Sequence, residues 1–310
     1  MTRCQSAICH ASAALVPGAL LLPLALAHAQ GLDPRAYANL PVGLNFVIAG
    51  YGYTEGKIAF DPSTPITDAQ YYSNLAAFAY VHSFGAWGNS TRFDMVLPTA
   101  TFSGHALVAG QARQREVSGL GDPQFRVSVN FYGAPALSLK QYAGYQQDLL
   151  VGASLQVSAP LGQYDNTKLV NLGNNRWSFK PELGVSKAWG SWTVDLAPSV
   201  TLYTDNHDFN GGKTLAQDPL YAVQGHVIHS FPTGSWIALG ATYFAGNRTG
   251  LNGVRGDNMQ GNSRVGMTFA LPLDRFNSLK LYASMGTSTR TGSDFSAAGI
   301  AWQYRWADGQ

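Results

Sequence analysis

Polar and apolar residues alternate along much of this chain. Between Asn89 and Asn130, the stretches R-F-D-M-V-L and Q-F-R-V-S-V-N-F alternate in this way, and a polar, Gly-rich stretch separates them. Successive residues of a strand point to opposite faces of a sheet, so the pattern predicts strands with one apolar face. Such a face could be buried in a soluble β-sandwich, or it could contact lipid in a membrane β-barrel.

Twelve segments have this period-two character, which predicts twelve strands. Helical periodicity is weak throughout, and the best candidate, residues 136–147, would form one or two turns. The twelve segments are Val42–Tyr53, Tyr72–Phe84, Ser90–Pro98, Gln124–Tyr132, Asp148–Ala159, Arg176–Ala188, Trp192–Thr204, Leu220–Phe231, Ser235–Gly246, Ser263–Leu271, Ser278–Thr289 and Phe295–Trp306.

The connections between the segments favour the barrel. They are short after segments 2, 6, 8 and 10 and long and polar after segments 1, 3, 5, 7 and 9; the long one after segment 4 and the short one after segment 11 are exceptions. Antiparallel strands in serial order place odd and even connections at opposite rims. Short periplasmic turns and long outer loops are typical of outer-membrane barrels. Most segments also reach the 9–11 residues that a tilted membrane strand needs, whereas strands of soluble proteins average about five or six. The fold class expected is all-β, a transmembrane up-and-down antiparallel barrel of about 12 strands.

Charged residues in the segments fall on the face opposite the apolar row. An Arg or Lys facing lipid at mid-depth costs about 2–4 kcal/mol, so this face should point into the lumen. Charges of both signs could also pair across a narrow barrel and plug it. The expected lumen lining is Arg92, Asp94, Arg126, Tyr132, Lys180, Glu182, Asp195, Tyr203, His226, Arg264, Lys280, Tyr282 and Arg305.

Tryptophans gather near the short connections and the last strand. Amphipathic aromatic rings favour the headgroup layer, so these residues are expected to form a periplasmic aromatic girdle in contact with outer-membrane lipid. The closing stretch A-W-Q-Y-R-W resembles the aromatic-terminated strand that the barrel-assembly machinery recognises. The girdle residues are Trp87, Trp189, Trp192, Trp236, Trp302 and Trp306.

The first thirty residues predict export. Arg3 precedes an apolar stretch from Ala11 to Ala27, and Ala27-His28-Ala29 forms an A-x-A cleavage site. The apolar stretch is shorter than the 18–20 residues of a spanning helix, and two prolines interrupt it. We therefore expect residues 1–29 to be a cleaved secretory signal peptide and residues 30–310 to be a single barrel domain in the bacterial outer membrane.

Composition excludes several classes of protein. Both cysteines, Cys4 and Cys9, lie in the segment to be removed, so the mature chain has no disulfide or Cys-ligated metal. Charged residues make up only 12% of the chain and the net charge is +2, which gives no sign of a nucleic-acid partner. Outside the signal segment, no apolar run is long enough for a membrane helix.

Three stretches carry a resemblance to a known family: R-A-Y-A-N-L-P-V-G-L-N-F-V-I-A-G-Y-G-Y-T-E-G, G-L-G-D-P-Q-F-R-V-S-V-N-F and G-I-A-W-Q-Y-R-W. With them, nearly the whole mature chain resembles the outer-membrane proteins of the MetA-pathway of phenol degradation family, usually described as transporters. The resemblance implies a barrel and a link to aromatic-compound catabolism. It implies no catalytic residue.

Candidate chemistry is sparse in the mature chain. His226 and His229 are three apart on a strand and face opposite sides, so they cannot share a metal; no metal or other cofactor is expected. A hydrolase needs a nucleophile and base within hydrogen-bond reach, but His82-Ser83 and His229-Ser230 are adjacent and so are split across the wall. The G-L-G-D-P stretch precedes a strand, whereas phosphate binding would need a helix N-terminus.

The sequence thus predicts a non-enzymatic porin-like channel for the passive uptake of small aromatic or amphipathic solutes. A structural or adhesive barrel with a closed lumen is the alternative, and an outer-membrane hydrolase is the third. Pro181 and Pro198 each remove a donor from a strand, so bulges are expected there.

Overall fold

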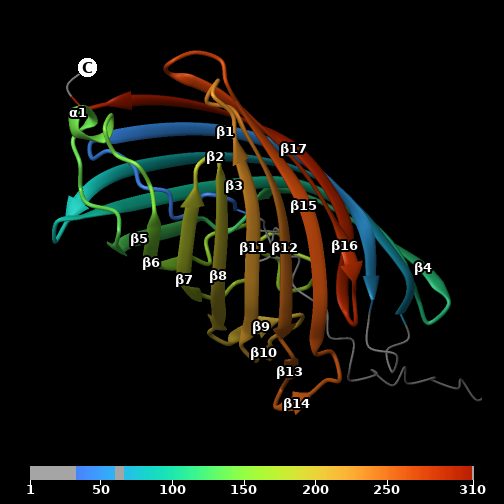
Figure 1. Cartoon of the computed structure of the whole chain (residues 1–310). Coiled ribbons are helices and arrows are strands. Elements are labelled where there is room, and N and C mark those ends of the chain that lie inside the picture. The colour runs from blue at the N-terminus through green and yellow to red at the C-terminus, as the bar shows by residue number, and fades with distance from the viewer. Residues whose placement is uncertain (1–32, 60–65, 309–310) are drawn as a thin grey trace, which may run out of the picture.

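The computed structural model describes residues 33–59 and 66–308, so the expected signal peptide lies outside the described residues. Twelve strands of this part form one closed antiparallel barrel in which each strand pairs with its neighbours along the chain (Figure 1). The wall strands are β1 (Leu44–Ala59), β2 (Ile66–Ala86), β3 (Asn89–Val108), β5 (Gln124–Tyr132), β6 (Leu149–Ser158), β7 (Ser178–Trp189), β8 (Trp192–Tyr203), β11 (Leu220–Ser230), β12 (Trp236–Gly246), β15 (Gln260–Pro272), β16 (Asn277–Ser288) and β17 (Gly292–Ala307).

The first and last strands close the barrel. Every residue of β1 pairs with β17, from Leu44 opposite Ala307 to Ala59 opposite Gly292. No wall strand is therefore left with an unpaired edge, as a sheet in lipid requires. The predicted fold class is confirmed, and all twelve predicted segments coincide with wall strands.

Several elements outside the wall differ from the prediction. Residues 99–120 continue β3 and return as β4 (Gln111–Leu120), a hairpin that extends beyond the wall at the outer end (Figure 1). Four short strands form a second sheet at this end: β9 (Asn206–Phe209), β10 (Lys213–Gln217), β13 (Thr249–Leu251) and β14 (Val254–Arg255). At the turn end, α1 (Leu139–Tyr142) is a single turn with a capping box between Ser138 and Gln141, and it lies within the expected helical stretch 136–147.

The prolines do not produce the expected bulges. Between β7 and β8, Phe179 pairs with Leu202, Glu182 with Ser199 and Val185 with Leu196, which is one unbroken register. The ladder only omits pairs around Pro181 and Pro198. Losing a hydrogen bond is thus accommodated locally, and the alternation of faces continues past both prolines.

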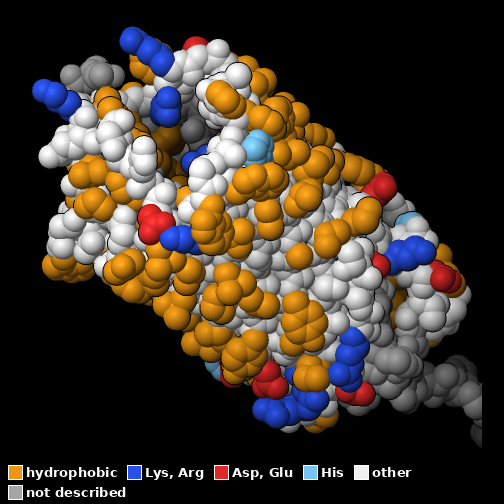
Figure 2. All heavy atoms as spheres, viewed as in Figure 1, with side chains coloured by type: hydrophobic (Ala, Val, Ile, Leu, Met, Phe, Trp, Pro, Cys, Tyr) orange, Lys and Arg blue, Asp and Glu red, His pale blue; other side chains and the backbone are white. Residues whose placement is uncertain are grey.

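Apolar side chains cover the outer surface of the wall, and charged ones gather mainly at the two ends (Figure 2). Many large apolar residues are more than one-third exposed and alternate with inward-facing polar residues. Examples from five strands are Leu155, Leu183, Val227, Leu239 and Leu281. No helix of the described residues is long and apolar enough to cross a membrane.

A charge placed on the outer face tests this orientation. Leu281 lies near the middle of β16 and is 48% exposed. We expect Leu281→Arg to reduce the free energy of unfolding in lipid vesicles by about 2–4 kcal/mol, because its guanidinium would face hydrocarbon. Urea titration followed by tryptophan fluorescence measures this, with Leu281→Met as the control. Equal stability of the Arg and Met variants would contradict a lipid-facing Leu281.

Candidate functional site

The barrel encloses a cavity of about 1310 Å³. Its lining begins at the turn end with Arg35, Trp236 and Arg275 and reaches Arg264 and Phe295 toward the outer end. The cavity therefore follows the long direction of the strands.

One side of this cavity is apolar. Side chains of β1 and β2 that point inward, including Phe46, Ile48, Leu75 and Ala79, line it together with small residues of β17. The adjoining side, which begins at β3 next to β2, carries Arg92, Asp94, Arg126 and Lys180 from β3, β5 and β7. The interior is thus amphipathic, and none of the residues of its apolar side was among the predicted lumen residues.

Glu182 is the centre of the charged side. Its side chain is only 3% exposed and forms ion pairs with Arg126 at 3.0 Å and with Lys180 at 3.3 Å. It also accepts hydrogen bonds from Gln224 Nε2 and from the Tyr37 hydroxyl. Because a buried charge is costly unless it is paired and hydrogen-bonded, these four contacts compensate for the burial of the Glu182 side chain.

The chain before β1 passes inside the barrel. Asp33 forms an ion pair with Arg126 at 3.5 Å, and the backbone N–H of Arg35 donates a hydrogen bond to the Asp195 carboxylate at 2.9 Å. Asn130 donates to the carbonyl oxygen of Tyr37 at 3.0 Å. Residues 33–41, called the internal segment below, therefore occupy part of the lumen and are bound to the wall strands β5 and β8.

Tyr37 anchors the internal segment in a socket made by two glycines. Its hydroxyl lies 3.0 Å from Glu182 Oε1 and 3.1 Å from Ser154 Oγ, and the residue is 4% exposed. A Cβ at Gly152 would come within 2.7 Å of the Tyr37 ring, and one at Gly184 would overlap it. Glycine at both positions is thus required for the ring to lie against the wall.

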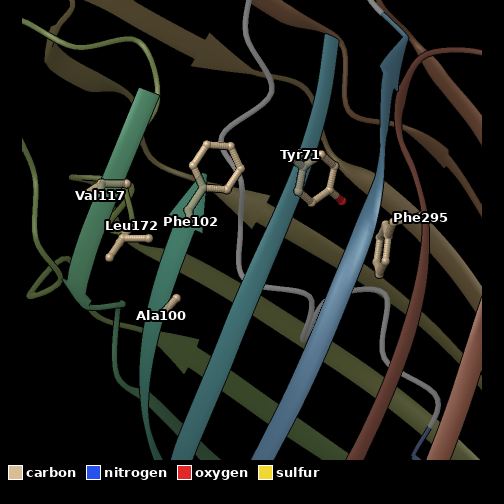
Figure 3. Close-up of a cluster of buried hydrophobic side chains, with 6 residues drawn as sticks. All are labelled: Tyr71, Ala100, Phe102, Val117, Leu172 and Phe295. Carbon is tan, nitrogen blue, oxygen red and sulfur yellow. The ribbon is translucent and has the colours of Figure 1, made fainter. Parts of the chain in front are cut away.

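An apolar cluster narrows the outer end of the lumen. Tyr71, Phe102 and Phe295 point inward from β2, β3 and β17, and Leu172 packs against them from the segment between β6 and β7 (Figure 3). The rings of Tyr71 and Phe102 stack with centroids 5.7 Å apart. Hydrophobic packing therefore narrows the outer end, whereas ionic and hydrogen-bonded contacts hold the internal segment.

Buried polar residues fix the outer connections. Asp122 accepts hydrogen bonds from the backbone N–H groups of Gly162 and Asn174, and burial raises the pKa of its carboxyl. Arg176 lies over the ring of Tyr203 at 4.8 Å, and burial lowers the pKa of its guanidinium to about 10. The guanidinium remains protonated at neutral pH, since this value is well above 7.

The predicted lumen residues have different surroundings in the structure. Glu182, Asp195, Tyr203 and His226 lie on the inward faces of β7, β8 and β11 but are not among the residues that line the cavity. Tyr132 lies outside: the register shifts between Asn130 and Tyr132, and the side chain is 59% exposed. That bulge is the physical reason for its placement. The residues that line the cavity are Arg92, Asp94, Arg126, Lys180, Arg264, Lys280, Tyr282 and Arg305.

The predicted girdle tryptophans also separate. Trp87, Trp189, Trp192 and Trp302 are exposed at the turn end. Trp306 borders the cavity and lies 5.9 Å from the ring of Tyr304.

Trp236 instead faces the lumen, where the Arg35 guanidinium lies 5.6 Å from its ring. Its place at the first position of β12 puts it on the inward face, shared with Ala238 and Thr242. Its ring therefore binds the internal segment and does not contact lipid.

Asp33, Arg35 and Tyr37 were missed by the sequence reasoning. They precede the first alternating segment, and nothing in a strand pattern places a chain inside its own barrel. One signal was available: an acid and an aromatic residue stand between the expected cleavage site and the first strand.

The geometry gives no support to a metal or hydrolytic site. Among residues 33–59 and 66–308, no group of three or more His, Cys, Asp or Glu side chains could hold a metal ion. Ser83 is fully buried and donates to the Pro41 carbonyl oxygen, while His82 Nδ1 contacts Asn45 Oδ1.

A closed sheet with an apolar outer face and ionic groups inside defines a β-barrel of the bacterial outer membrane. The family model described as "Putative MetA-pathway of phenol degradation" matches residues 51–304, and the chain belongs to this family. No curated protein matches the chain.

Solved structures share the fold. An outer membrane channel from Pseudomonas putida F1 superimposes with a TM-score of 0.77 at 20% identity, covering 89% of this chain and 100% of that one. The transport unit of the autotransporter AIDA-I from Escherichia coli has a TM-score of 0.50 at 10% identity, covering 89% and 94%.

Filling the socket tests whether the internal segment restricts the lumen. We expect Gly184→Ala to displace Tyr37 and to raise the single-channel conductance in planar bilayers, because the new methyl group would occupy the place of the ring. Gly225→Ala is the control, since a Cβ there has no neighbour closer than 3.6 Å. Unchanged conductance in the folded Gly184→Ala protein would show that the internal segment does not limit ion flow.

Proposed function

We propose that the protein is an outer-membrane channel through which small aromatic or amphipathic solutes diffuse passively. The observation that carries this proposal is the amphipathic cavity of about 1310 Å³. Small-molecule sites are typically apolar with a few placed polar groups, and the lining of this somewhat larger cavity likewise combines an apolar side with polar and charged groups. Such a lining suits a solute with a ring and one polar substituent.

The path would use the two sides of the cavity differently. The ring would move along Phe46, Ile48 and Leu75, while the polar substituent exchanges partners on the charged side. Lining side chains and the outer connections would set selectivity. The family description refers to phenol degradation, and the Pseudomonas putida structure is described as a channel; both favour this proposal.

A structural or adhesive barrel with a closed lumen is the second candidate. The internal segment and the apolar cluster at the outer end both favour it, because each occupies space that a solute would need. A hydrolase receives no such support, since His82 and Ser83 lie on opposite faces of β2. In either case, we expect the barrel-assembly machinery to recognise the aromatic end of β17.

Liposome swelling separates the two candidates. Proteoliposomes containing the full mature chain should swell with phenol, and more slowly with sugars of similar or larger size, if the cavity admits aromatic solutes. Liposomes with protein that remains unfolded on a heat-modifiability gel provide the baseline. Absence of swelling with every solute would favour the closed barrel.

Lys280 offers a test of ion selectivity. It lines the cavity and has no ion pair among the described residues, so its charge acts directly on ions inside. We expect Lys280→Ala to lower the chloride-to-potassium permeability ratio by about twofold or more, because the attraction of chloride to the Lys280 ammonium group is lost. Reversal potentials across a salt gradient measure this.

The control is Lys57→Ala, which removes an exposed charge near the outer end of β1. If Lys280→Ala and Lys57→Ala had the same reversal potential, ions would not be passing Lys280.

A further inference from the structure

Arg264 differs from the paired cations on the charged side of the cavity. Arg92, Arg126 and Lys180 each contact a carboxylate within 4.0 Å. Arg264, from β15, has no ion pair in the described part of the chain, although it is only 3% exposed. Asp294 acts on it electrostatically but lies beyond the 4.0 Å of an ion pair. A buried guanidinium without an ion pair is a costly arrangement that calls for a reason.

Not all N–H donors of the Arg264 guanidinium have a hydrogen-bond partner. Its Nη2 donates to Ser284 Oγ at 3.0 Å, and its Nη1 is buried without any hydrogen-bond partner. The guanidinium carbon lies 3.5 Å from the centre of the Phe295 ring. This cation–π contact fixes the plane of the guanidinium but supplies no hydrogen-bond acceptor. The guanidinium can therefore still donate to a planar group with two oxygens, such as a carboxylate.

Apolar surface adjoins the Arg264 guanidinium toward the outer end of the cavity. Phe295 belongs to the cluster with Tyr71 and Phe102, and Ala297 packs against the same cluster (Figure 3). The cavity lining includes Arg264, Phe295 and Ala297. A flat hydrocarbon group could therefore lie near the rings while a polar group reaches the guanidinium.

Tyr282 adds a second polar group on the same wall. It lies two residues from Ser284 on the inward face of β16, a spacing of about 7 Å along the strand. Its hydroxyl lies over Gly52 and Gly299, where added Cβ atoms would collide with it. This hydroxyl lines the cavity and has no hydrogen-bond partner in residues 33–59 and 66–308.

We propose that Arg264, with Phe295 and Tyr282, forms a subsite that binds aromatic monocarboxylates. The carboxylate would accept charge-assisted hydrogen bonds from Arg264, and the ring would pack near Phe295. This inference deepens the proposed channel function by naming a class of solute, and it rests on solute access to the cavity.

Binding to the detergent-solubilised full chain tests the subsite without requiring transport. Isothermal titration with benzoate should give saturable binding, and benzyl alcohol, which has the ring without the charge, should bind more weakly. We expect Arg264→Gln to weaken benzoate binding by about tenfold or more, since charge-assisted hydrogen bonds are lost, and to leave benzyl alcohol within about twofold.

The matched control is Arg113→Gln, because Arg113 is an exposed guanidinium on β4 that donates a hydrogen bond to Gln111. A heat-modifiability gel confirms folding of each variant. If Arg264→Gln fails to fold, Tyr282→Phe and Arg264→Lys serve instead, and each should weaken benzoate binding by about threefold or more.

Two outcomes would overturn the subsite: no benzoate binding to the folded wild-type chain, or equal benzoate affinity in the Arg264 and Arg113 variants. A purely structural Arg264 would give the second result together with a lower melting temperature. Phenol-driven swelling reports separately on the channel. Swelling without Arg264-dependent benzoate binding would contradict only the proposed subsite. Arg264-dependent binding without swelling would contradict only the proposed channel function.

Discussion

The need to satisfy every backbone hydrogen bond in the absence of water governs this structure. Hydrocarbon offers no partner to an exposed N–H or C=O group, so a sheet can cross a membrane only when its edges are joined. Here the pairing of β1 with β17 provides that closure along the whole of β1. Once the sheet is closed, alternation divides side chains between lipid and lumen. The two prolines of β7 and β8 remove only nearby pairs between these strands, because the register before and after each proline is the same.

The interior is stabilised differently on its two sides. Glu182 joins Arg126, Lys180 and Tyr37 into one network, so strands and the internal segment depend on the same carboxylate. The side formed by β1 and β2 is apolar, which leaves an amphipathic space between them. An interior of this type can select solutes by shape and by polarity together. Arg264 and Lys280 differ from the paired cations of this network, because neither forms an ion pair among the described residues.

Strand number, direction and the facing of charged residues could be predicted because they follow from period-two alternation, which is a local property. What could not be predicted depends on contacts distant in the chain. Tyr132 leaves the lumen because one bulge reverses its face, and Trp236 turns inward because the strand begins at that residue. Residues 99–120 were read as a polar connection since their polar side chains are typical of a loop, yet they form the β3–β4 hairpin. Tyr37 could be placed only by knowing that Gly152 and Gly184, from two other strands, adjoin in space.

The β3–β4 hairpin has a consequence for the outside of the cell. Although the wall has no free edge, β4 pairs as a strand only with β3. Apart from the Leu120 carbonyl oxygen, which accepts from the Gln163 N–H, its other side presents unpaired backbone groups above the membrane. Such an exposed strand is a template on which a neighbouring polypeptide could add and begin aggregation. Arg113, Arg115 and Glu116 lie along it, and crowding by these hydrated, charged groups disfavours the approach of another chain. The ionic residues of β4 thus contribute to solubility at the cell surface, where closure of the sheet gives no protection.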